Sequence, residues 1–265
     1  MLLKTKNLMK AFGGLKAIDK VDFELPAGEI RGIIGPNGSG KSTFFNLVSG
    51  VYDPDPGSYI EFDGHDITNE PPHKIGALGL SRTFQLLRLY QDMSVINNVM
   101  SGYHTRVKYK FLDAVIGRKK IWDQEKEIKD EMMELLSFVG LADYAELNAS
   151  ELSGGQRRLL VLARAIAMKP KLLMLDEPAA GLSPVNVDNL MKIIMQLKDK
   201  YGLTLIIIEH ILKVVMDTCN TVTVLDHGQK IAEGTPNQVK DDNAVIEAYL
   251  GKKMNDEEMR KALAV

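Results

Sequence analysis

The sequence predicts an α/β fold with a helical segment inserted into it, and three observations support this prediction. Short aliphatic runs that are typical of buried strands occur in both the N-terminal and the C-terminal part of the chain. A glycine-rich loop follows one of the first of these runs and leads into a predicted helix. From about residue 86 the pattern becomes helical, and strand-like runs return near residue 171. This order favours a sheet covered by helices, with a helical subdomain inserted.

The N-terminal part is predicted to be rich in strands. Residues 1–34 have a β-like pattern, and the run 29–34 predicts a short buried strand that leads into the glycine-rich loop. Residues 41–50 predict a helix that ends at a glycine, which is the residue most common just after a helix. Residues 58–67 predict a hairpin with Asp63-Gly64 as its turn.

The later part of the chain contains two predicted amphipathic helices. One apolar stripe, ended by Gly140, has the spacing of a helix and consists of Ile128, Met132, Leu135, Leu136 and Val139. A second helix is predicted to begin at Ser183-Pro184, where serine is a good N-cap and proline suits the first helical position. Its apolar face is Val187, Leu190, Ile194 and Leu197. Residues 171–178 and 203–208 predict buried strands, and residues 221–234 predict a hairpin.

Composition excludes several classes of protein. The chain has 265 residues, of which 45% are hydrophobic and 26% charged, and its net charge of -2 does not favour a dedicated nucleic-acid binder. No run approaches the ~20 apolar residues of a membrane-spanning helix, so we expect no transmembrane segment. Cys219 is the single cysteine, which we interpret as a small buried apolar residue.

The residues between 35 and 43 match the phosphate-loop pattern, with a predicted strand before them and a predicted helix after them. Glycines let successive backbone N–H groups point at phosphate oxygens. Lys41 is expected to reach the β- and γ-phosphates, and the Ser42 hydroxyl to coordinate Mg²⁺. The predicted nucleotide-binding residues here are Gly35, Pro36, Asn37, Gly38, Ser39, Gly40, Lys41, Ser42 and Thr43.

An acidic pair follows the buried run at 172–175. Such a position suits a carboxylate that binds Mg²⁺ beside a phosphate loop, so Asp176 is the expected metal ligand. Glu177 projects differently and is the candidate base that polarises the attacking water. The alternative is that both carboxylates only cap the turn before Pro178.

A second glycine-containing motif, LSGGQ, lies at residues 152–156 and precedes a helical pattern. Backbone N–H groups at a helix N-terminus attract anions, which predicts a second phosphate site. Its residues are Ser153, Gly154, Gly155 and Gln156.

Taken in order, GPNGSGKST, LSGGQ and LLMLDEP resemble the ATP-binding subunits of ABC transporters. The resemblance covers roughly residues 2–251 and implies a P-loop ABC ATPase core with an antiparallel β-subdomain and an inserted α-helical subdomain. It implies one domain over residues 1–251, with the helical subdomain at about 86–165. Residues 252–265 are then a C-terminal tail, which we expect to be an exposed or frayed helix.

The resemblance also implies roles for single residues and two cofactors, ATP and Mg²⁺. Phe12 matches the aromatic residue that stacks on adenine, Gln85 the glutamine that contacts Mg²⁺ or the attacking water, and His210 the histidine that reaches the γ-phosphate. The catalytic set is thus Lys41, Gln85, Glu177 and His210, and the metal set is Ser42, Gln85 and Asp176. The alternatives are a core phenylalanine, a surface glutamine and a structural histidine.

The resemblance further implies that LSGGQ contacts ATP on the phosphate loop of a second chain, so that two chains sandwich two nucleotides. One departure from the family pattern lies at Ser183, where the family often has aspartate. A role for Ser183 in communication between the two sites is in doubt, and an N-cap role is the alternative.

Residues 79–99 and 230–251 look like the ATPase subunits of branched-chain amino-acid importers. The expected partners are integral membrane permease subunits, a second ATP-binding subunit that is homologous or identical, and indirectly an extracytoplasmic solute-binding protein. The chain is then a peripheral protein at the cytoplasmic face of the membrane. The basic segment 103–122 is either a solvated helical face or a region near anionic lipid or a partner loop.

The sequence leaves other functions open, both within the ABC family and outside transport. The alternatives within the family are ATPases of urea or amide import and of lipopolysaccharide export. Outside transport, the alternatives are a soluble ABC protein that acts on DNA or ribosomes, and a switch that binds ATP without hydrolysis.

Overall fold

The computed structural model describes residues 1–83, 89–103 and 118–250. The chain forms two compact units. The core unit contains residues 1–82, 171–181 and those from 194 onward, and the helical unit contains residues 83–170 and 182–193. The predicted tail, residues 252–265, lies outside the described residues.

Sheet A of the core unit is antiparallel and has the strand order β2-β1-β4-β5. Its strands are β1 (Leu3–Phe12), β2 (Leu15–Leu25), β4 (Tyr59–Phe62) and β5 (His65–Asp66). The hairpin predicted at residues 58–67 is confirmed. Its turn residues Asp63 and Gly64 have φ angles of 50° and 78°, the left-handed region that a tight hairpin turn requires.

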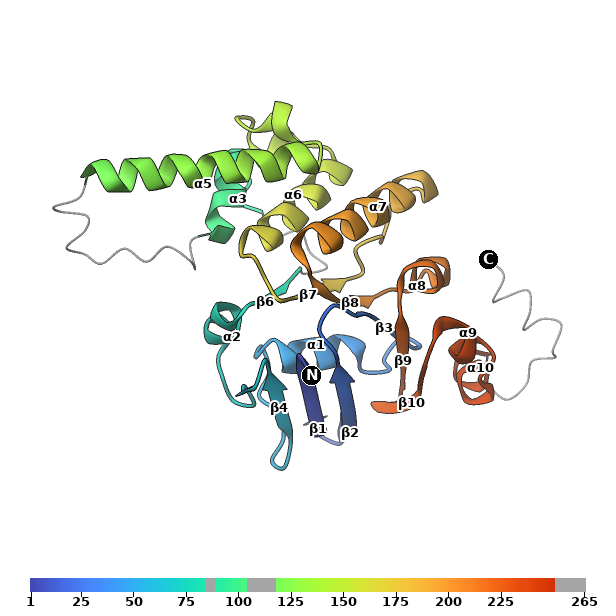
Figure 1. The fold of residues 1–265 in the computed structure, drawn as a ribbon. Helices are drawn as coiled ribbons and strands as arrows, with labels where there is room; N and C mark the ends of the chain where they lie inside the picture. Colours follow the sequence, from blue (N-terminus) through green and yellow to red (C-terminus); the bar gives the residue numbers. More distant parts are fainter. Residues whose placement is uncertain (84–88, 104–117, 251–265) are drawn as a thin grey trace. The chain divides into compact units, whose positions relative to one another are not determined.

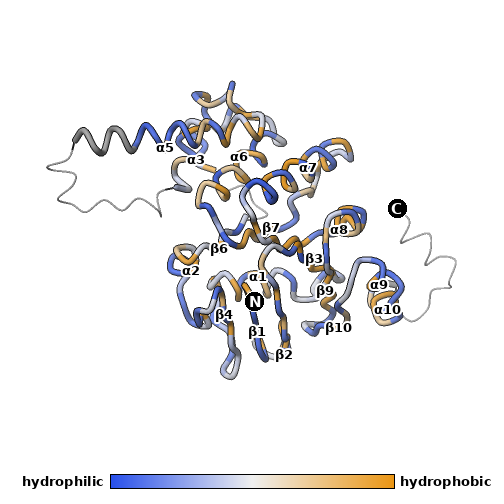
Figure 2. The backbone as a smooth tube through the Cα atoms, viewed as in Figure 1, coloured by the Kyte–Doolittle hydropathy of each residue, from blue (hydrophilic) through white to orange (hydrophobic). Residues whose placement is uncertain are grey.

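Sheet B has the strand order β10-β9-β3-β8-β7-β6. Its strands are β3 (Ile30–Ile34), β6 (Leu80–Arg82), β7 (Leu172–Asp176), β8 (Thr204–Ile208), β9 (Thr221–Asp226) and β10 (Gln229–Gly234). All neighbouring pairs are parallel except β9 and β10. Every residue of β3, β7 and β8 is buried, and most of these residues are apolar, as expected for strands covered on both faces (Figure 2). The polar exceptions are Arg31, Asp176 and Thr204.

The register of sheet B brings the predicted site residues to one edge. Ile33 of β3 pairs with Ile208 of β8, and Ile208 pairs with Asp176 of β7. The segments that leave these three strands therefore begin side by side, because the strands are parallel. These segments carry the phosphate loop, the acidic pair and His210.

Helix α1 (Lys41–Val48) contributes to a hydrophobic core that both sheets share (Figure 1). Phe44 and Phe45 are fully buried, and the Phe44 ring meets Phe23 of β2 edge-on with a centroid separation of 5.1 Å. Gly50 follows the helix with a φ of 70°, as the sequence predicts. The other helices of the core unit are α2 (Pro72–Leu78), α8 (Leu212–Thr218), α9 (Pro236–Lys240) and α10 (Asn243–Leu250).

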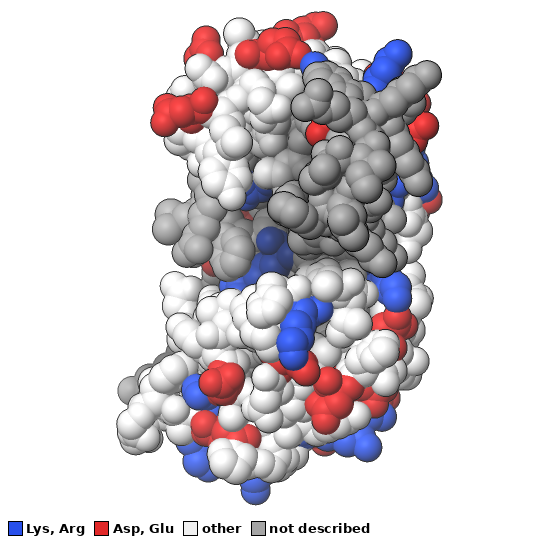
Figure 3. Space-filling model, turned by 90° about the vertical axis from the view of Figure 1, so that its left-hand side faces the viewer, with Lys and Arg blue, Asp and Glu red and all other residues white. Residues whose placement is uncertain are grey.

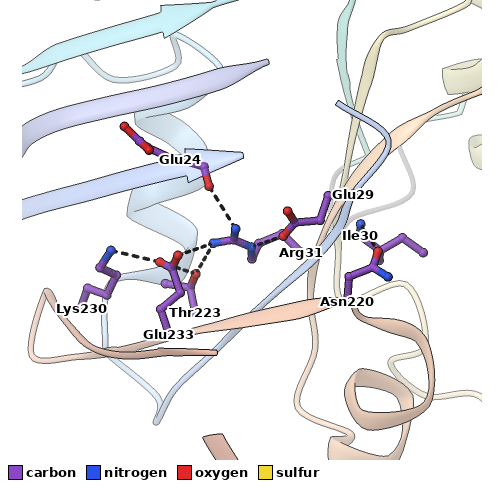
Figure 4. Close-up of polar contacts among 8 residues, drawn as sticks. All are labelled: Glu24, Glu29, Ile30, Arg31, Asn220, Thr223, Lys230 and Glu233. Atoms are coloured by element: carbon purple, nitrogen blue, oxygen red, sulfur yellow. Dashed lines mark hydrogen bonds and ion pairs between the residues drawn. The ribbon is translucent and has the colours of Figure 1, made fainter. Parts of the chain in front are cut away.

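Arg31 is a buried cation that connects the two sheets (Figure 4). Its guanidinium donates to the carbonyl oxygen of Glu24 on β2 at 3.0 Å and lies over the Phe23 ring, 5.1 Å from its centroid. The remaining partners are on or beside sheet B: Glu29 at 2.7 Å, Thr223 at 3.1 Å and Glu233 at 3.2 Å. A buried cation needs such a set of acceptors, since burying an unpaired charge is costly.

The helical unit contains α3 (Val95–Tyr103), α5 (Arg118–Phe138), η2 (Ala142–Tyr144), η3 (Ala149–Glu151), α6 (Gly154–Ala167) and the first part of α7 (Pro184–Tyr201). The predicted stripe from Ile128 to Val139 is buried, and Gly140 ends it with a φ of 75°. The apolar face predicted for α7 is buried as well. Among the described residues, no helix has both the length and the apolar character needed to cross a bilayer.

On the face that Figure 3 draws, basic and acidic side chains both occur among the described residues. This mixture agrees with the nearly balanced composition, 33 basic and 35 acidic residues.

Candidate functional site

The phosphate loop follows β3 in a conformation that requires glycine at two positions. Gly40 has a φ of 105°, and a Cβ atom there would lie 2.4 Å from the carbonyl oxygen of Ala17. At Gly35 a Cβ atom would lie 2.0 Å from the carbonyl oxygen of Leu225. The loop is anchored by the Gly228 N–H, which donates to the Ser39 carbonyl at 3.0 Å. A side chain at either glycine would therefore force the loop away from its neighbours.

Lys41 is buried and folds back over the loop. Its Nζ donates to the carbonyl oxygens of Gly35 at 2.8 Å and Pro36 at 2.9 Å. Burial lowers the pKa of the Lys41 ammonium, while the carboxylates of Glu177 and Asp176 act to raise it. The lysine is thus within the electrostatic range of the acidic pair that the sequence predicts beside it.

Asp176 lies at the end of β7 and is 8% exposed through its side chain. Its Oδ2 accepts a hydrogen bond from Nη2 of Arg82 at 2.8 Å. The same guanidinium donates to Asn46 Oδ1 at 2.7 Å and Ser49 Oγ at 3.1 Å, both at the end of α1 or just after it. It also lies 5.3 Å from the centroid of the Phe45 ring.

Glu177 and His210 lie in contact. Nε2 of His210 is 2.8 Å from Oε1 of Glu177, although the two residues are 33 positions apart. Glu177 has a φ of 49°, which a non-glycine residue rarely adopts. Backbone strain of this kind occurs where surrounding contacts hold a residue for function. The pair joins a carboxylate and an imidazole, the two side-chain types most used in proton transfer.

Phe12 lies at the end of β1 with 45% of its surface exposed, so it is not a core residue. Its ring meets Tyr52 edge-on, with centroids 5.4 Å apart. The Lys10 ammonium lies 5.6 Å from the Phe12 centroid. An exposed aromatic side chain is the kind of group on which a nucleobase stacks, so Phe12 stays a candidate for that role.

The LSGGQ motif of the helical unit forms the beginning of α6. Ser153 is the N-cap, and its Oγ accepts from the Gln156 N–H at 3.3 Å. In return, Oε1 of Gln156 accepts from the Ser153 N–H at 2.9 Å, which completes a capping box. Open space surrounds the position where a Cβ atom of Gly154 or Gly155 would lie. The helix N-terminus is therefore accessible to a ligand.

Comparison with known proteins identifies the family. A family model for ABC transporters matches residues 18–180, and one for branched-chain amino acid ATP-binding cassette transporters matches residues 229–253. The chain belongs to the ABC transporter family. It is an ATP-binding cassette, which makes it a nucleotide-binding protein and an ATPase by family.

Individual relatives of the cassette cover almost the whole chain. It is 37% identical over 94% of its length to the high-affinity branched-chain amino acid transport ATP-binding protein BraF of Pseudomonas aeruginosa, and the match spans 98% of that protein. It is 41% identical over 94% of its length to a probable branched-chain amino acid transport ATP-binding protein of Archaeoglobus fulgidus, 95% of which is covered. A solved nucleotide-free cassette from an ABC transporter superposes with a TM-score of 0.81 at 35% identity, covering 95% of this chain and 99% of the other.

The donor set of the cassette fits magnesium. Ser42 is exposed at the second position of α1, and Asp176 supplies a carboxylate at the same edge of sheet B. Hydroxyl and carboxylate oxygens are the ligands that Mg²⁺ prefers. Among the described residues, no group of three or more His, Cys, Asp or Glu side chains is placed to hold a metal ion.

Several predicted residues of the cassette lie outside the part that the structure describes. They are Gln85 and most of the basic segment 103–122.

Ser183 precedes α7, and its carbonyl oxygen accepts from the Val187 N–H at 2.9 Å, as expected at a helix start.

Two residues of this site escape sequence reasoning. Arg82 holds Asp176, and Glu209 is a buried carboxylate next to His210. The available signal was a charged residue within or directly after an apolar strand, at Arg82 in LSR and at Glu209 after TLIII. Such a position predicts burial of a charge, although it does not identify the partner.

Proposed function

We propose that this cassette hydrolyses ATP to drive a membrane importer, and that branched-chain amino acids are its cargo. The observation that supports hydrolysis best is the contact of Glu177 Oε1 with His210 Nε2 at 2.8 Å, at the edge of sheet B where the phosphate loop begins. The cargo is supported by the relatives that match over 94% of the chain, which are branched-chain amino acid transport ATP-binding proteins by name. Urea, amides and lipopolysaccharide are the alternative cargoes.

In the proposed mechanism, Lys41 exchanges the Gly35 and Pro36 carbonyl oxygens for the β- and γ-phosphate oxygens of ATP. The loop N–H groups and the N-terminus of α1 bind the same phosphates. Ser42, Asp176 and Gln85 would hold Mg²⁺, which would supply neutralisation of the phosphate charge when bound. Phe12 stacks on the adenine.

Glu177 then accepts a proton from the attacking water, and His210 orients Glu177 and contacts the γ-phosphate. A base at this position is expected to contribute about 10²–10⁴ in rate. Gln85 contacts Mg²⁺ or the attacking water, as the family resemblance implies.

The working form in this proposal is a dimer. The accessible N-terminus of α6, with Ser153, Gly154, Gly155 and Gln156, binds the γ-phosphate of ATP held by a second cassette. Two ATP molecules then lie between the two chains, and their hydrolysis allows the chains to separate. The second cassette is either a homologous subunit or a copy of this chain.

The remaining partners follow from the importer assignment. The pair of cassettes binds integral permease subunits at the cytoplasmic face of the membrane. A solute-binding protein outside the membrane delivers the cargo.

A single substitution tests hydrolysis. In Glu177→Gln, the amide cannot accept the proton, so phosphate release should fall by about 10²–10⁴ while ATP binding is retained. Glu146→Gln changes a surface carboxylate that is 77% exposed and serves as the control. Equal phosphate release by wild type and Glu177→Gln would refute the mechanism.

Cargo requires a separate experiment. Affinity purification of the cassette from its own cells should recover permease subunits and a second cassette. Leucine, isoleucine or valine, added with the binding protein, should stimulate ATP hydrolysis by the reconstituted complex. Stimulation by urea or an amide instead would transfer the assignment to that alternative.

A further inference from the structure

Glu209 is a buried carboxylate that directly follows β8, and it is only 2% exposed. Its Oε1 accepts a hydrogen bond from the backbone N–H of Ala179 at 2.7 Å. Its Oε2 accepts from the backbone N–H of His210 at 3.2 Å. The Ile211 N–H is a third donor to the same carboxylate.

These contacts join two loops that carry the candidate catalytic residues. Ala179 belongs to the loop after β7, which contains Glu177, and His210 begins the loop after β8. The strands themselves are neighbours, with Asp176 paired to Ile208. Glu209 therefore connects the backbones of the two loops just beyond the end of the sheet.

The loop after β7 needs such support. Glu177 has a φ of 49°, a conformation that costs free energy and persists only where surrounding contacts impose it. On one side, the Glu177 N–H donates to the Ile208 carbonyl at 2.9 Å. On the other side, Glu209 holds Ala179. The strained residue is thus anchored at its own N–H and two residues later.

The choice of glutamate at this position also needs an explanation. Burial raises the pKa of the Glu209 carboxyl, and the nearby Glu177 carboxylate adds to the rise, against the backbone donors that lower it. A buried carboxylate is costly unless it is hydrogen-bonded. A carboxylate is, however, a side chain whose two oxygens both accept, so it satisfies N–H groups from two loops at once.

We propose that Glu209 is a positioning residue for ATP hydrolysis, which sets the placement of Glu177 relative to His210 by joining the two loops. The inference rests on the proposed function, because positioning matters only if the pair takes part in hydrolysis. Glu209 does not contact the nucleotide in this proposal. Its effect is expected in the rate of the chemical step and not in the binding of ATP.

The substitution Glu209→Gln tests the proposal with little change in shape. The amide keeps one acceptor oxygen, and its NH₂ group faces a backbone N–H with no acceptor between them. A misplacement of about 1 Å in a catalytic group can cost about 10²-fold in rate. We expect kcat to fall about 10- to 100-fold, with KM and the Kd for ATP within about 3-fold of wild type.

A matched control separates positioning from the general effect of altering an acid that is largely shielded from solvent. Glu29→Gln changes a carboxylate with 15% side-chain exposure that pairs with Arg31 before the start of β3, at the other end of the strands. Glu29→Gln is expected to keep kcat within about 2-fold of wild type. The stability of each variant is measured by urea unfolding so that the kinetic values refer to folded protein.

A second readout follows the His210 ring directly by NMR of side-chain-labelled protein. In wild type the His210 ring resonances report the contact of Nε2 with Glu177, and Glu177→Gln defines their positions when that carboxylate is absent. At one fixed pH, Glu209→Gln should shift the His210 ring resonances toward those of Glu177→Gln, whereas Glu29→Gln should leave them unchanged. A purely structural role of Glu209 would not shift these resonances.

The outcomes are distinguishable. If wild type does not hydrolyse ATP, the proposed function fails. If wild type is active and Glu209→Gln matches Glu29→Gln in both kcat and His210 ring resonances, the inference about Glu209 is wrong. Should Glu209→Gln not fold, Glu209→Asp, one methylene shorter, is judged by the same two readouts. If neither variant folds, hydrogen exchange of the backbone amides in wild type decides. The Ala179 amide, which donates to Glu209, must then be protected from exchange. Rapid exchange at Ala179 would overturn the inference.

Discussion

Arg82 at the end of β6 and Asp176 at the end of β7 form a buried ion pair, with Nη2 and Oδ2 2.8 Å apart and side chains only 7% and 8% exposed. The same guanidinium hydrogen-bonds Asn46 and Ser49, at the far end of the helix that starts in the phosphate loop. One side chain therefore links the proposed magnesium ligand to side chains at the end of the helix that follows the phosphate loop. Charged groups removed from water in this way stay buried only when they are paired and hydrogen-bonded.

Removing the Arg82 charge should destabilise the fold. In Arg82→Met the Asp176 carboxylate loses its cationic partner, and breaking a buried pair in this way costs about 3–5 kcal/mol. Urea unfolding of the nucleotide-free protein measures the loss. Lys74→Met is the control, because Lys74 and Glu70 are also 2.8 Å apart but 60% and 38% exposed. An exposed pair contributes only about 0–1 kcal/mol, so equal losses in the two variants would contradict this account.

Ser153→Arg should separate ATP binding from assembly. The arginine side chain removes the N-cap hydroxyl and fills the open space at the start of α6, where we place the partner's γ-phosphate. The isolated monomer should bind ATP with unchanged Kd, while ATP-driven dimerisation and turnover are lost. Analytical ultracentrifugation with ATP and the Glu177→Gln background measures the dimer. Loss of ATP binding by the monomer would show that LSGGQ serves the phosphate loop of its own chain.

Gly32 allows α8 to pack against β3. A Cβ atom at this position would lie 3.0 Å from Cys219 Sγ and 3.0 Å from Val215 Cγ1. Overpacking a core typically costs about 1–3 kcal/mol, so Gly32→Ala should destabilise by that amount in urea unfolding. Combining it with Cys219→Ala should recover part of the loss by removing the sulfur. Gly14→Ala, with no atom within 4 Å of its Cβ position, is the control, and an equal loss there would reject the packing argument.

The Cys219 thiol should be unreactive in the native protein. Burial raises the pKa of this thiol from 9.0 to about 12, so the reactive thiolate is scarce at neutral pH. Labelling by a disulfide reagent at pH 8 should be slow and should become fast in urea. Fast labelling of the native protein would mean that the thiol is accessible.

The same thiol makes a pH-dependent contribution to stability. The unfolded chain releases the proton near pH 9.0 and the folded chain only near pH 12, so the folded state binds more protons between these values. The free energy of unfolding therefore falls as pH rises from about 9 to 12, by up to about 1.4 kcal/mol per pH unit. Cys219→Ala should lose less stability over this range than wild type in urea unfolding. Identical pH slopes for the two proteins would contradict the assignment.

Much of the fold could be predicted because its signals are local. The hairpin at Asp63-Gly64, the glycine after α1 and the stripe from Ile128 to Val139 each depend on residues a few positions apart. A short segment is enough to show where glycine allows an unusual backbone conformation or where side chains have the spacing of a helix. The phosphate loop was predictable for the same reason, because nine consecutive residues carry its chemistry.

The contacts between distant segments were not predictable in this way. Arg82 and Asp176 are 94 positions apart, and Glu209 reaches Ala179 over 30 positions. No spacing rule connects such pairs, since the order of strands in sheet B decides which strand ends are neighbours. The sequence signals only that a charged residue stands beside a buried run.

The amino-acid sequence alone therefore predicted the groups of the candidate site: a phosphate loop, an acidic pair, a helix N-terminus that suits an anion, and a histidine after a buried strand. Tertiary structure alone decided how the site is held, with Arg82 on Asp176, His210 on Glu177, and Glu209 between the two loops. The physical reason is that chemical groups and local backbone preferences are properties of short segments. The neutralisation of a buried charge depends instead on which segments the packed sheet brings together.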